Sequence, residues 1–365
     1  MNVPKLRFKE FNDNYLRLKY KDVLKIKSGK DQKQVECENG IYPILGTGGQ
    51  IGKTNSFLYD KPSVLIGRKG TINKPQYMET PFWTVDTLFY SHIYEPNIPK
   101  YLFYSFQNVN WRKYDESTGV PSLSSSTIEG VDCNIPSKEE QLKVAYFLSL
   151  LDKKIELQSK KIEDLKLFKK GLVNHIIKNI EIEKIPLKNI LVEQNNKTSK
   201  NNEYEILSST SKGLYLQKDY FNKQAASDNN VGYKILKKNQ LVLSPQNLWM
   251  GNINVNTEYN IGIVSPSYKI FNISNNVNID FFNYWIKSPK ALFEYKISSE
   301  QGASIVRRNL NMDLFYEIIV DLPRGKLQNK VGKIIKLLNL NIQYNEFLLQ
   351  KLLELKKGLM QNMFV

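Results

Sequence analysis

The sequence predicts an α+β protein in which two mixed α/β globular domains alternate with two long helices. Its 365 residues and 42.4 kDa exceed what one ordinary hydrophobic core organises, which indicates two domains. Residues 135–177 match residues 322–364 at a constant offset of 187, without a gap. Short Val, Ile, Tyr and Phe runs separated by Gly, Asn and Pro fill the remaining chain, as is typical of strands and turns. The expected order is globular domain 1–134, helix 135–180, globular domain 181–323 and helix 324–365.

The first globular domain contains strand-like segments and one short local helix. Apolar runs at 18–24, 42–45 and 63–67 indicate extended segments, and residues 99–107 indicate a helix. A polar stretch and an apolar strand at 130–136 then lead into the first long helix.

The first long helix carries the heptad pattern of a coiled coil. From Val144 to Ile176, the positions that step alternately by four and three residues are apolar, except Gln158 and Lys169. A helix of roughly forty residues is about 60 Å long, since each residue adds 1.5 Å.

The second globular domain repeats the first more weakly. Its segments 187–191, 204–207 and 240–244 resemble the strand-like segments of the first domain, and 280–286 indicates a local helix. An apolar strand at 317–323 leads into the second long helix. The two halves of the chain therefore follow one plan.

The polar interruptions of the two helical seams coincide. Asn345 and Lys356 of the second helix occupy the positions of Gln158 and Lys169 in the first. Polar residues within such a seam fix register and partner at some cost in stability. We therefore expect the two helices to pair with each other, with Gln158 and Asn345 as the matched helix-pairing residues. The alternative is that each helix packs separately on its own domain.

The charge of the chain points to a polyanionic partner. Its 52 Lys and Arg against 36 Asp and Glu give a net charge of +16 and a pI of about 9.4. Residues 135–180 and 324–365 hold 18 of the basic and 8 of the acidic residues, so most of the excess forms a basic spine on the helices. The alternative is a Lys-rich composition with no partner behind it.

Composition also argues against several protein classes. The chain has no run of eighteen apolar residues and its first residues lack the apolar stretch of a signal peptide, so a cytoplasmic protein without membrane contact is expected. Cys37 and Cys133 lie far apart, and only His92 and His175 could supply imidazole. Neither a disulfide framework nor a metal site is expected.

One segment imitates a phosphate-binding loop. Residues 45–54 end in Gly-Lys-Thr, but Thr47 stands where that motif needs its first glycine, and residues 55–62 make a poor helix. Two histidines do not allow a Ser, His, Asp constellation to be assembled, and the carboxylates of the helices fit solvated faces. We expect no catalytic site in this chain. A nucleotide-binding enzyme that uses residues 46–54 is the less favoured alternative.

Several motifs accompany the repeat of domains and helices. They are the opening 4–11, the Ile66-Gly67-Arg68-Lys69-Gly70 turn, Ile135-Pro136 and Leu322-Pro323 before the helices, Glu139-Glu140-Gln141 leading into Leu150-Leu151-Asp152, and the Lys-Lys-Gly-Leu endings at 169–172 and 356–359. With these motifs the whole chain resembles the specificity subunit of type I restriction-modification enzymes. One departure is that the second helix opens with Gly325-Lys326-Leu327-Gln328, which keeps the glutamine and lacks the acidic pair.

The resemblance implies separate roles for the globular units, the helices and the partner subunits. Each globular unit would be a target recognition domain that reads one half of a split, asymmetric sequence in double-stranded DNA. The helices, paired as an antiparallel coiled coil, would fix the spacer, because half-sites about 34 Å apart require a stiff connector. The family's partners are two modification subunits, which bind S-adenosylmethionine and methylate adenine, and restriction subunits, which use ATP and Mg²⁺. This chain would bind no cofactor itself.

Candidate DNA contacts are the arginines, amides and glycine- or serine-rich turns of the two domains. Amides and guanidinium groups can form paired hydrogen bonds with base edges, whereas Lys, Ser and Thr hold phosphates. Since 45 of the 52 basic residues are Lys, the few arginines are the more informative. Plain turns and strand-end caps are the alternative for each loop. The candidates are Thr47, Gly48, Gly49, Gln50, Lys53, Arg68, Lys69, Thr71, Ser124 and Ser125 in the first domain, and Ser209, Ser211, Lys212, Gln246, Asn247, Ser304, Arg307, Arg308 and Asn309 in the second.

A rival function from another class is a coiled-coil scaffold with no role on DNA. Salt-dependent DNA binding by the assembled complex would separate the two, because neutralising phosphates releases counterions.

Overall fold

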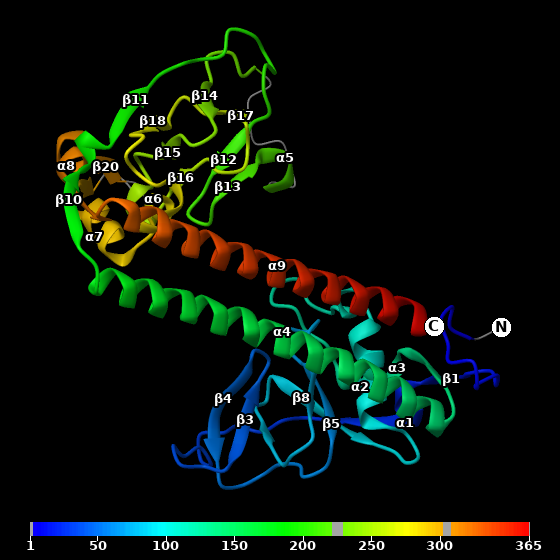
Figure 1. The fold of residues 1–365 in the computed structure, drawn as a ribbon. Coiled ribbons are helices and arrows are strands. Elements are labelled where there is room, and N and C mark those ends of the chain that lie inside the picture. The colour runs from blue at the N-terminus through cyan, green and yellow to red at the C-terminus, as the bar shows by residue number, and fades with distance from the viewer. Residues whose placement is uncertain (1–2, 221–228, 302–307, 365) are drawn as a thin grey trace. The chain divides into compact units, whose positions relative to one another are not determined.

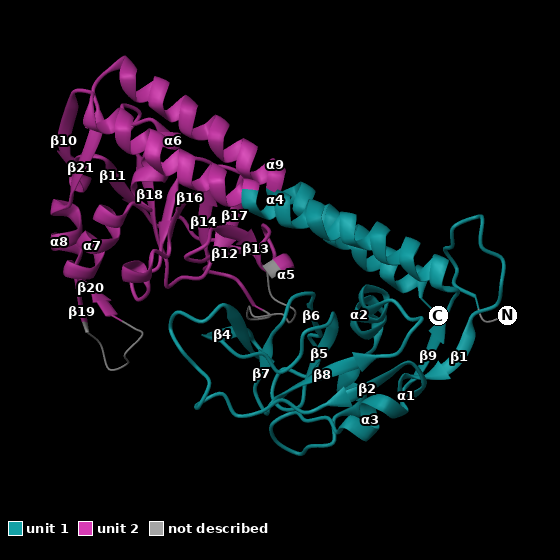
Figure 2. Ribbon diagram, turned by 90° about the horizontal axis from the view of Figure 1, so that it is seen from below, with its two compact units in different colours: residues 1–160, 346–365 teal, residues 161–345 magenta. Residues whose placement is uncertain are grey.

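The computed structural model describes residues 3–220, 229–301 and 308–364 and divides into two compact units. Unit 1 comprises residues 1–160 with 346–365, and unit 2 comprises residues 161–345 (Figure 2). Each unit combines one globular region with a part of both long helices. The four-part division expected from the sequence stays a prediction, because these units cut across the helices.

Unit 1 is built on two small sheets and a strand pair. β1 (Leu16–Lys19) runs antiparallel to β9 (Asp132–Ile135), the strand that leads into the first long helix. A four-stranded antiparallel sheet has the order β2-β8-β5-β6, and a three-stranded sheet has the order β4-β3-β7. Figure 1 labels β5 and β8 of the first sheet and β3 and β4 of the second. The bounds of the strands in both sheets are β2 (Leu24–Lys27), β3 (Tyr42–Gly46), β4 (Gly49–Thr54), β5 (Ser63–Gly67), β6 (Gln76–Met78), β7 (Trp83–Thr84) and β8 (Leu88–Ile93).

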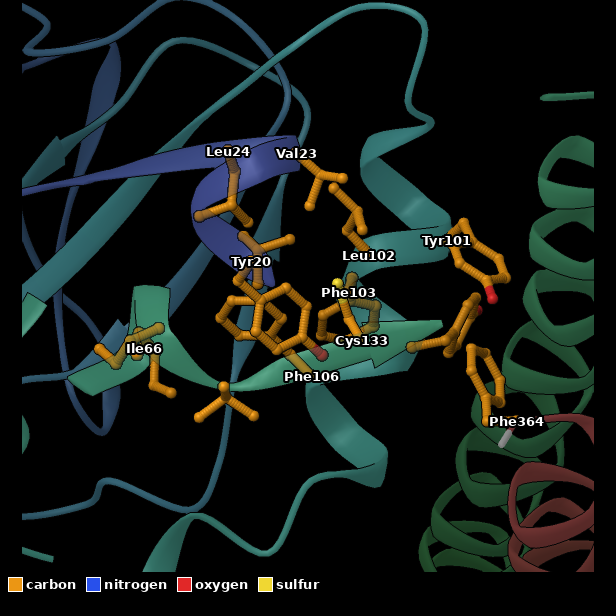
Figure 3. Close-up of a cluster of buried hydrophobic side chains, with 14 of the residues drawn as sticks. Tyr20, Val23, Leu24, Ile66, Tyr101, Leu102, Phe103, Phe106, Cys133 and Phe364 are labelled. Atoms are coloured by element: carbon orange, nitrogen blue, oxygen red, sulfur yellow. The ribbon is translucent and has the colours of Figure 1, made fainter. Parts of the chain in front are cut away.

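A helix with buried residues on all sides holds the core of unit 1 together. α2 (Pro99–Asn108) has Pro at its first position, which suits a helix start, and its residues 101–106 are all buried. The ring of Tyr101 stacks on Phe364 at 5.3 Å, so the C-terminal end of the chain closes this core (Figure 3). The shorter helices of the unit are α1 (Tyr20–Val23), η1 (Trp111–Tyr114) and α3 (Ser125–Gly130).

Unit 2 repeats this arrangement. β10 (Ile182–Pro186) runs antiparallel to β21 (Ile319–Pro323), and a four-stranded antiparallel sheet has the order β11-β18-β15-β16. Three further strand pairs are β12-β13, β14-β17 and β19-β20. The remaining bounds are β11 (Leu191–Gln194), β12 (Leu207–Ser209), β13 (Leu214–Leu216), β14 (Lys234–Lys237), β15 (Leu241–Leu243), β16 (Ile253–Val255), β17 (Ile261–Val264), β18 (Lys269–Ile273), β19 (Ser299–Gln301), β20 (Arg308–Leu310), η2 (Leu187–Asn189), α5 (Gln217–Tyr220), η3 (Leu248–Met250), α6 (Ile279–Trp285), α7 (Pro289–Ile297) and α8 (Met312–Glu317).

The two four-stranded sheets have the same order and direction of strands. β2, β8, β5 and β6 of unit 1 correspond to β11, β18, β15 and β16 of unit 2. The weak sequence similarity between 63–67 and 240–244 therefore marks equivalent strands, β5 and β15. Side chains on a shared scaffold of this kind can differ freely at the loops, because the core positions alone must stay apolar.

The two long helices pack together, and this confirms the predicted α+β class with paired helices. α4 (Lys138–Lys178) and α9 (Lys326–Met363) are each unbroken. In unit 1 the start of α4 shares a core with the end of α9, and in unit 2 the end of α4 shares a core with the start of α9. The pairing is antiparallel, and the alternative of helices packed on separate domains is wrong.

The predicted pairing residues occupy the seam differently. Asn345 is buried, and its Nδ2 donates to the backbone oxygen and to Oδ1 of Asn341, both at 2.7 Å. Gln158 is half-buried and belongs to unit 1, whereas Asn345 belongs to unit 2. Their mutual contact stays a prediction.

A glutamine attaches each long helix to its globular region in the same way. Gln141 Oε1 accepts from the backbone N–H of Ile98, the N-cap of α2, at 2.9 Å, and Gln141 Nε2 donates to the Pro136 oxygen at 3.1 Å. Gln328 Oε1 accepts from the backbone N–H of Asn278, the N-cap of α6, and Gln328 Nε2 donates to the Pro323 oxygen at 3.4 Å. The glutamine that both helix starts retain is therefore a shared attachment point.

The acidic residue of the first helix start has a partner that unit 2 lacks. Glu140 is buried and binds Arg7 through both carboxylate oxygens, at 2.8 and 2.7 Å, and accepts from the Tyr15 hydroxyl at 2.8 Å. Burial and this hydrogen bond raise the pKa of Tyr15. In α9 the equivalent residue is Leu327, which is exposed. The difference follows from the segment before β1, which only unit 1 has to anchor.

No helix within residues 3–220, 229–301 and 308–364 combines the length and apolar character that crossing a membrane requires.

Candidate nucleic-acid interface

Three of the predicted segments of unit 1 meet at one place. A Cβ added at Gly70 would lie 3.8 Å from the Thr47 hydroxyl, which puts the β3–β4 turn beside the turn after β5. Lys69 forms a β-bridge with Ser122, and the backbone N–H of Leu123 donates to the Arg68 oxygen at 3.0 Å. The loop 119–126 is thereby fixed against the Arg68 turn. Residues far apart in sequence form one continuous surface.

The glycine-rich segment of unit 1 is a β-hairpin and not a phosphate-binding loop. Gly46 and Gly49 are paired, so Thr47 and Gly48 form a two-residue turn between β3 and β4. Gly49 has φ +116°, a conformation that favours glycine. Lys53 lies within β4, where the nucleotide motif would require a helix start. The segment therefore lacks the loop-to-helix geometry on which the alternative of a nucleotide site at 46–54 was based.

The side chains of this surface differ in how free they are to reach a ligand. Arg68 and Lys69 are exposed, and among the described residues Arg68 has no side-chain hydrogen bond or ion pair. Ser124 caps α3, since its hydroxyl accepts from the Thr127 N–H at 3.1 Å and donates to Glu116 at 2.9 Å. That role occupies the Ser124 hydroxyl. The remaining candidates are exposed at Gly48, Gln50 and Lys53 and half-buried at Thr47, Gly49, Thr71 and Ser125.

The serine-rich segment of unit 2 forms the corresponding hairpin. β12 and β13 are joined by residues 210–213, and Gly213 has φ +153°. Ser209 is buried and donates to Asn252 Oδ1 at 2.7 Å, while Asn254 Nδ2 donates to the Ser209 hydroxyl at 2.7 Å. Ser209 therefore supports the hairpin from within and does not present its hydroxyl at the surface. Ser211 and Lys212 at the turn are exposed.

The second candidate group of unit 2 gathers at the turn after β15. Gln246 is exposed, and its backbone oxygen accepts from the N–H of Arg308 at 3.1 Å, so 246–247 and 308–309 adjoin. The Arg308 guanidinium binds the Ser299 oxygen through Nε at 3.2 Å and through Nη2 at 2.5 Å. Ser299 directly follows the C-cap of α7, and Arg308 Nη2 also donates to the Lys296 oxygen in the last turn of α7 at 3.5 Å, where a cation is favourable. Asn309 is exposed and Asn247 half-buried, whereas Ser304 and Arg307 lie outside the described residues.

The two candidate surfaces are built from equivalent loops. In unit 1 the surface combines the β3–β4 hairpin with the turn that follows β5. In unit 2 it combines the β12–β13 hairpin with the turn that follows β15, the equivalent strand of the other four-stranded sheet. Unit 1 offers Arg68 and Lys69 at that turn, and unit 2 offers Gln246 and Asn247. The same scaffold therefore presents two chemically different sets of side chains.

Sequence reasoning missed a lysine that connects the loops of unit 2. Lys287, which follows α6, donates to the Gly251 oxygen at 2.7 Å and to the Ser211 oxygen at 3.2 Å. Burial lowers the pKa of Lys287 to about 8. Nothing in the sequence distinguishes this residue from the other lysines. In the part of the chain that the structure describes, no three His, Cys, Asp or Glu side chains gather as a metal site would require.

Comparisons with known proteins agree with this geometry. Residues 12–167 match the model of the type I restriction modification DNA specificity domain. The fold of the whole chain is similar to the crystal structure of the type I restriction-modification system S subunit from M. genitalium, with a TM-score of 0.67 at 16% identity over 100% of this chain and 99% of that one. It is also similar to a chain from a structure describing complex assembly and conformational transition of the type I R-M system, with a TM-score of 0.51 at 8% identity over 95% and 96% of the two chains. The expected resemblance to specificity subunits is confirmed.

Proposed function

We propose that this chain, whose residues 12–167 carry a type I restriction modification DNA specificity domain, is a specificity subunit that reads a bipartite, asymmetric target in double-stranded DNA. The observation that carries the proposal is the pair of equivalent loop surfaces. One scaffold with two sets of side chains is what independent reading of two different half-sites requires. The chain would act where the DNA of the cell lies, in the cytoplasm.

Two long helices suit the connection between such readers. Half-sites separated by about one helical turn of DNA require a connector of fixed length, and unbroken helices of 41 and 38 residues supply one. Their basic excess would attract the duplex without reading its sequence. Specificity would then rest on the few side chains at the loops.

A repeated apolar stripe supports docking of two copies of one partner. Leu150, Leu157 and Phe168 of α4 are all exposed, and their equivalents Leu337, Tyr344 and Leu355 of α9 are exposed as well. Spacings of 7 and 11 residues return to the same side of a helix within about 20°, so each set forms one stripe. Exposed apolar side chains that lie on one side of a helix offer a surface on which a partner could dock.

The partners that we propose are two modification subunits, one on each stripe, joined by restriction subunits. The modification subunits would bring S-adenosylmethionine and adenine methylation, and the restriction subunits would bring ATP- and Mg²⁺-dependent translocation and cleavage. This chain would hold no cofactor and no catalytic residue, and would direct where the partners act.

The test is selection of DNA by the assembled methylating complex. The complex of this chain with its two modification subunits is incubated with randomised duplexes, and the bound sequences are determined at several salt concentrations. We expect two short conserved blocks separated by a spacer of constant length, with binding that weakens as salt rises. One block alone would contradict two readers.

The rival function, a coiled-coil scaffold with no role on DNA, predicts a different result. It predicts partner binding through the exposed stripes, and a complex that selects no sequence and whose association with DNA is unchanged by this chain.

A further inference from the structure

A three-residue contact recurs where each globular region meets the helix pair. In unit 1, Lys356 Nζ lies 2.6 Å from Asp152 Oδ1 and 5.5 Å from the ring centre of Tyr104. In unit 2, Lys169 Nζ donates to Asn339 Oδ1 at 2.8 Å and lies 5.8 Å from the ring centre of Tyr284. Lys169 and Lys356 are equivalent in the sequence repeat, and so are residues 152 and 339. The same contact therefore has a carboxylate in unit 1 and an amide in unit 2.

This difference leaves the lysine of unit 2 without a counter-charge. Lys169 is half-buried and forms no ion pair within the described residues, and burial together with Lys166 lowers its pKa. In unit 1, by contrast, Asp152 neutralises Lys356 and also accepts from the Tyr104 hydroxyl at 2.8 Å. A partly buried ammonium without a carboxylate is unfavourable unless an anion joins it.

A cavity of about 550 Å³ opens at Lys169, the lysine of unit 2 that has no carboxylate partner among the described residues. It lies within unit 2, between the hairpin turn, the β16 region, the end of α6 and the two long helices. Four lysines line it, and none of the four forms an ion pair in the described part of the chain; the amide groups of several asparagines line it too. The lysines are Lys169, Lys170, Lys212 and Lys287, and the amides belong to Asn254, Asn256, Asn283 and Asn339.

Two further features favour an anion in this cavity. Lys287 donates to two backbone oxygens, at 2.7 and 3.2 Å, and forms no ion pair within the described residues. The start of α7 also lines the cavity, through Ser288, its N-cap, and Pro289. Helix starts carry a partial positive charge. Glu258 is the one carboxylate in the lining, and it is exposed.

The equivalent cavity of unit 1 is the internal comparison. It is lined by Lys356 and Lys357, the counterparts of Lys169 and Lys170, and by Lys74. Its central lysine is already paired with Asp152. The linings of the two cavities carry the same formal net charge, and the difference between them is that Asp152 neutralises Lys356 in unit 1 whereas Lys169 in unit 2 has no carboxylate partner among the described residues.

We propose that the cavity of unit 2 binds a phosphate group through its four lysines, and that the equivalent cavity of unit 1 does not. Phosphate fits because it carries up to two negative charges and accepts several hydrogen bonds at once from ammonium donors. Two sources share this chemistry: the backbone of bound duplex DNA and a free phosphate compound. The DNA source rests on the proposed function, whereas the site itself does not.

The first arm of the test uses inorganic phosphate on the full-length chain. Binding is measured by isothermal titration calorimetry for the unaltered chain, for Asn339→Asp and for Asp152→Asn. Asn339→Asp gives Lys169 the partner that Lys356 has, so the fold is kept while affinity falls by at least about tenfold. Asp152→Asn leaves the affinity at the unit 2 site unchanged. Saturable binding that is equal in all three proteins, or no saturable binding, would overturn the proposal.

A second pair of variants guards against an effect of Asn339→Asp on packing. Lys170 and Lys212 are exposed, so Lys170→Gln with Lys212→Gln removes charge from the cavity without disturbing the core. Lys357→Gln is the matched change in unit 1. The double variant should weaken phosphate binding, and Lys357→Gln should not; the reverse outcome, or equal losses, counts against the site.

The second arm identifies the source of the phosphate. DNA affinity of the assembled methylating complex is measured against salt concentration, with and without Asn339→Asp. If a backbone phosphate occupies the cavity, the slope of log K against log salt falls by about one. An unchanged slope combined with lost phosphate binding assigns the cavity to a free phosphate compound and contradicts the DNA source. A complex that binds no DNA refutes the proposed function, and the first arm still decides the cavity.

Discussion

The buried contact between Arg7 and Glu140 gives a quantitative test of how the first helix is anchored. The Glu140 side chain is 1% exposed and the Arg7 side chain 14% exposed, and their two hydrogen bonds are 2.8 and 2.7 Å long. Arg7→Met leaves the carboxylate buried with only the Tyr15 hydroxyl as a described partner. Removing one member of a buried pair costs about 3–5 kcal/mol, a large share of a typical total stability of about 5–15 kcal/mol.

The assay is native-state hydrogen exchange, because it reports the two units separately. A loss of about 3–5 kcal/mol accelerates exchange of the slowest amides at the start of α4 by roughly 150- to 4000-fold, while those of unit 2 stay unchanged. The control is Arg17→Met. Its ion pair with Asp132 at 2.8 Å is exposed on both sides and screened by solvent, so exchange at the start of α4 should change little.

A double variant tests the physical cause. Arg7→Met with Glu140→Met removes the buried charge together with its partner, so it should recover most of the stability that Arg7→Met alone loses. The reasoning is refuted if Arg7→Met behaves like Arg17→Met, or if the double variant is as unstable as the single one. Either result would mean that the electrostatics of this pair do not hold the segment before β1.

Three further predictions concern the readers, the partner stripes and the cysteines. Arg68→Ala should reduce discrimination at one half-site by about 1–3 kcal/mol in the selection experiment; equal loss at both halves would refute independent readers. Leu157→Glu and Tyr344→Glu each place a charge in one of the two stripes, so each variant should form a complex with only one modification subunit when the mass of the intact complex is measured. A complex that keeps both modification subunits would contradict the stripes as docking surfaces. Burial raises the pKa of Cys133 to about 12, so an alkylating reagent at pH 8 should modify only Cys37 in the native chain and both thiols in denaturant. Rapid modification of Cys133 in the native chain would contradict its burial.

The helices and their pairing could be predicted from sequence because periodicity and repetition are local signals. The apolar positions of the helix pair follow from their spacing in the sequence alone. Lys169 and Lys356 interrupt that pattern at equivalent positions, and in the structure each makes a specific side-chain contact. The partners in these contacts are Asp152 and Asn339. The sequence repeat aligns these two residues but does not show how buried they are. A difference of one carboxylate acquires meaning only once burial is known.

The loop residues were predicted less completely, for two physical reasons. Surface turns were found by their glycines and serines, and Thr47 and the Arg68 turn do adjoin. A sequence does not show which polar groups are consumed within the protein, however, and Ser209, Ser124 and Arg308 are engaged in a buried network, a helix cap and a helix end. Long-range burial also decides Lys287, so no local pattern could single it out.

The glutamine attachment has an evolutionary consequence. Gln141 and Gln328 bond to backbone N–H and C=O groups, so neither depends on which side chains the attached region carries. A globular region with a wholly different surface could replace the present one and still meet the helix at the same two atoms. The loop surfaces can therefore change in evolution while the attachment to the helices stays the same. A lineage could acquire a new specificity without altering how its globular regions are joined to the helices.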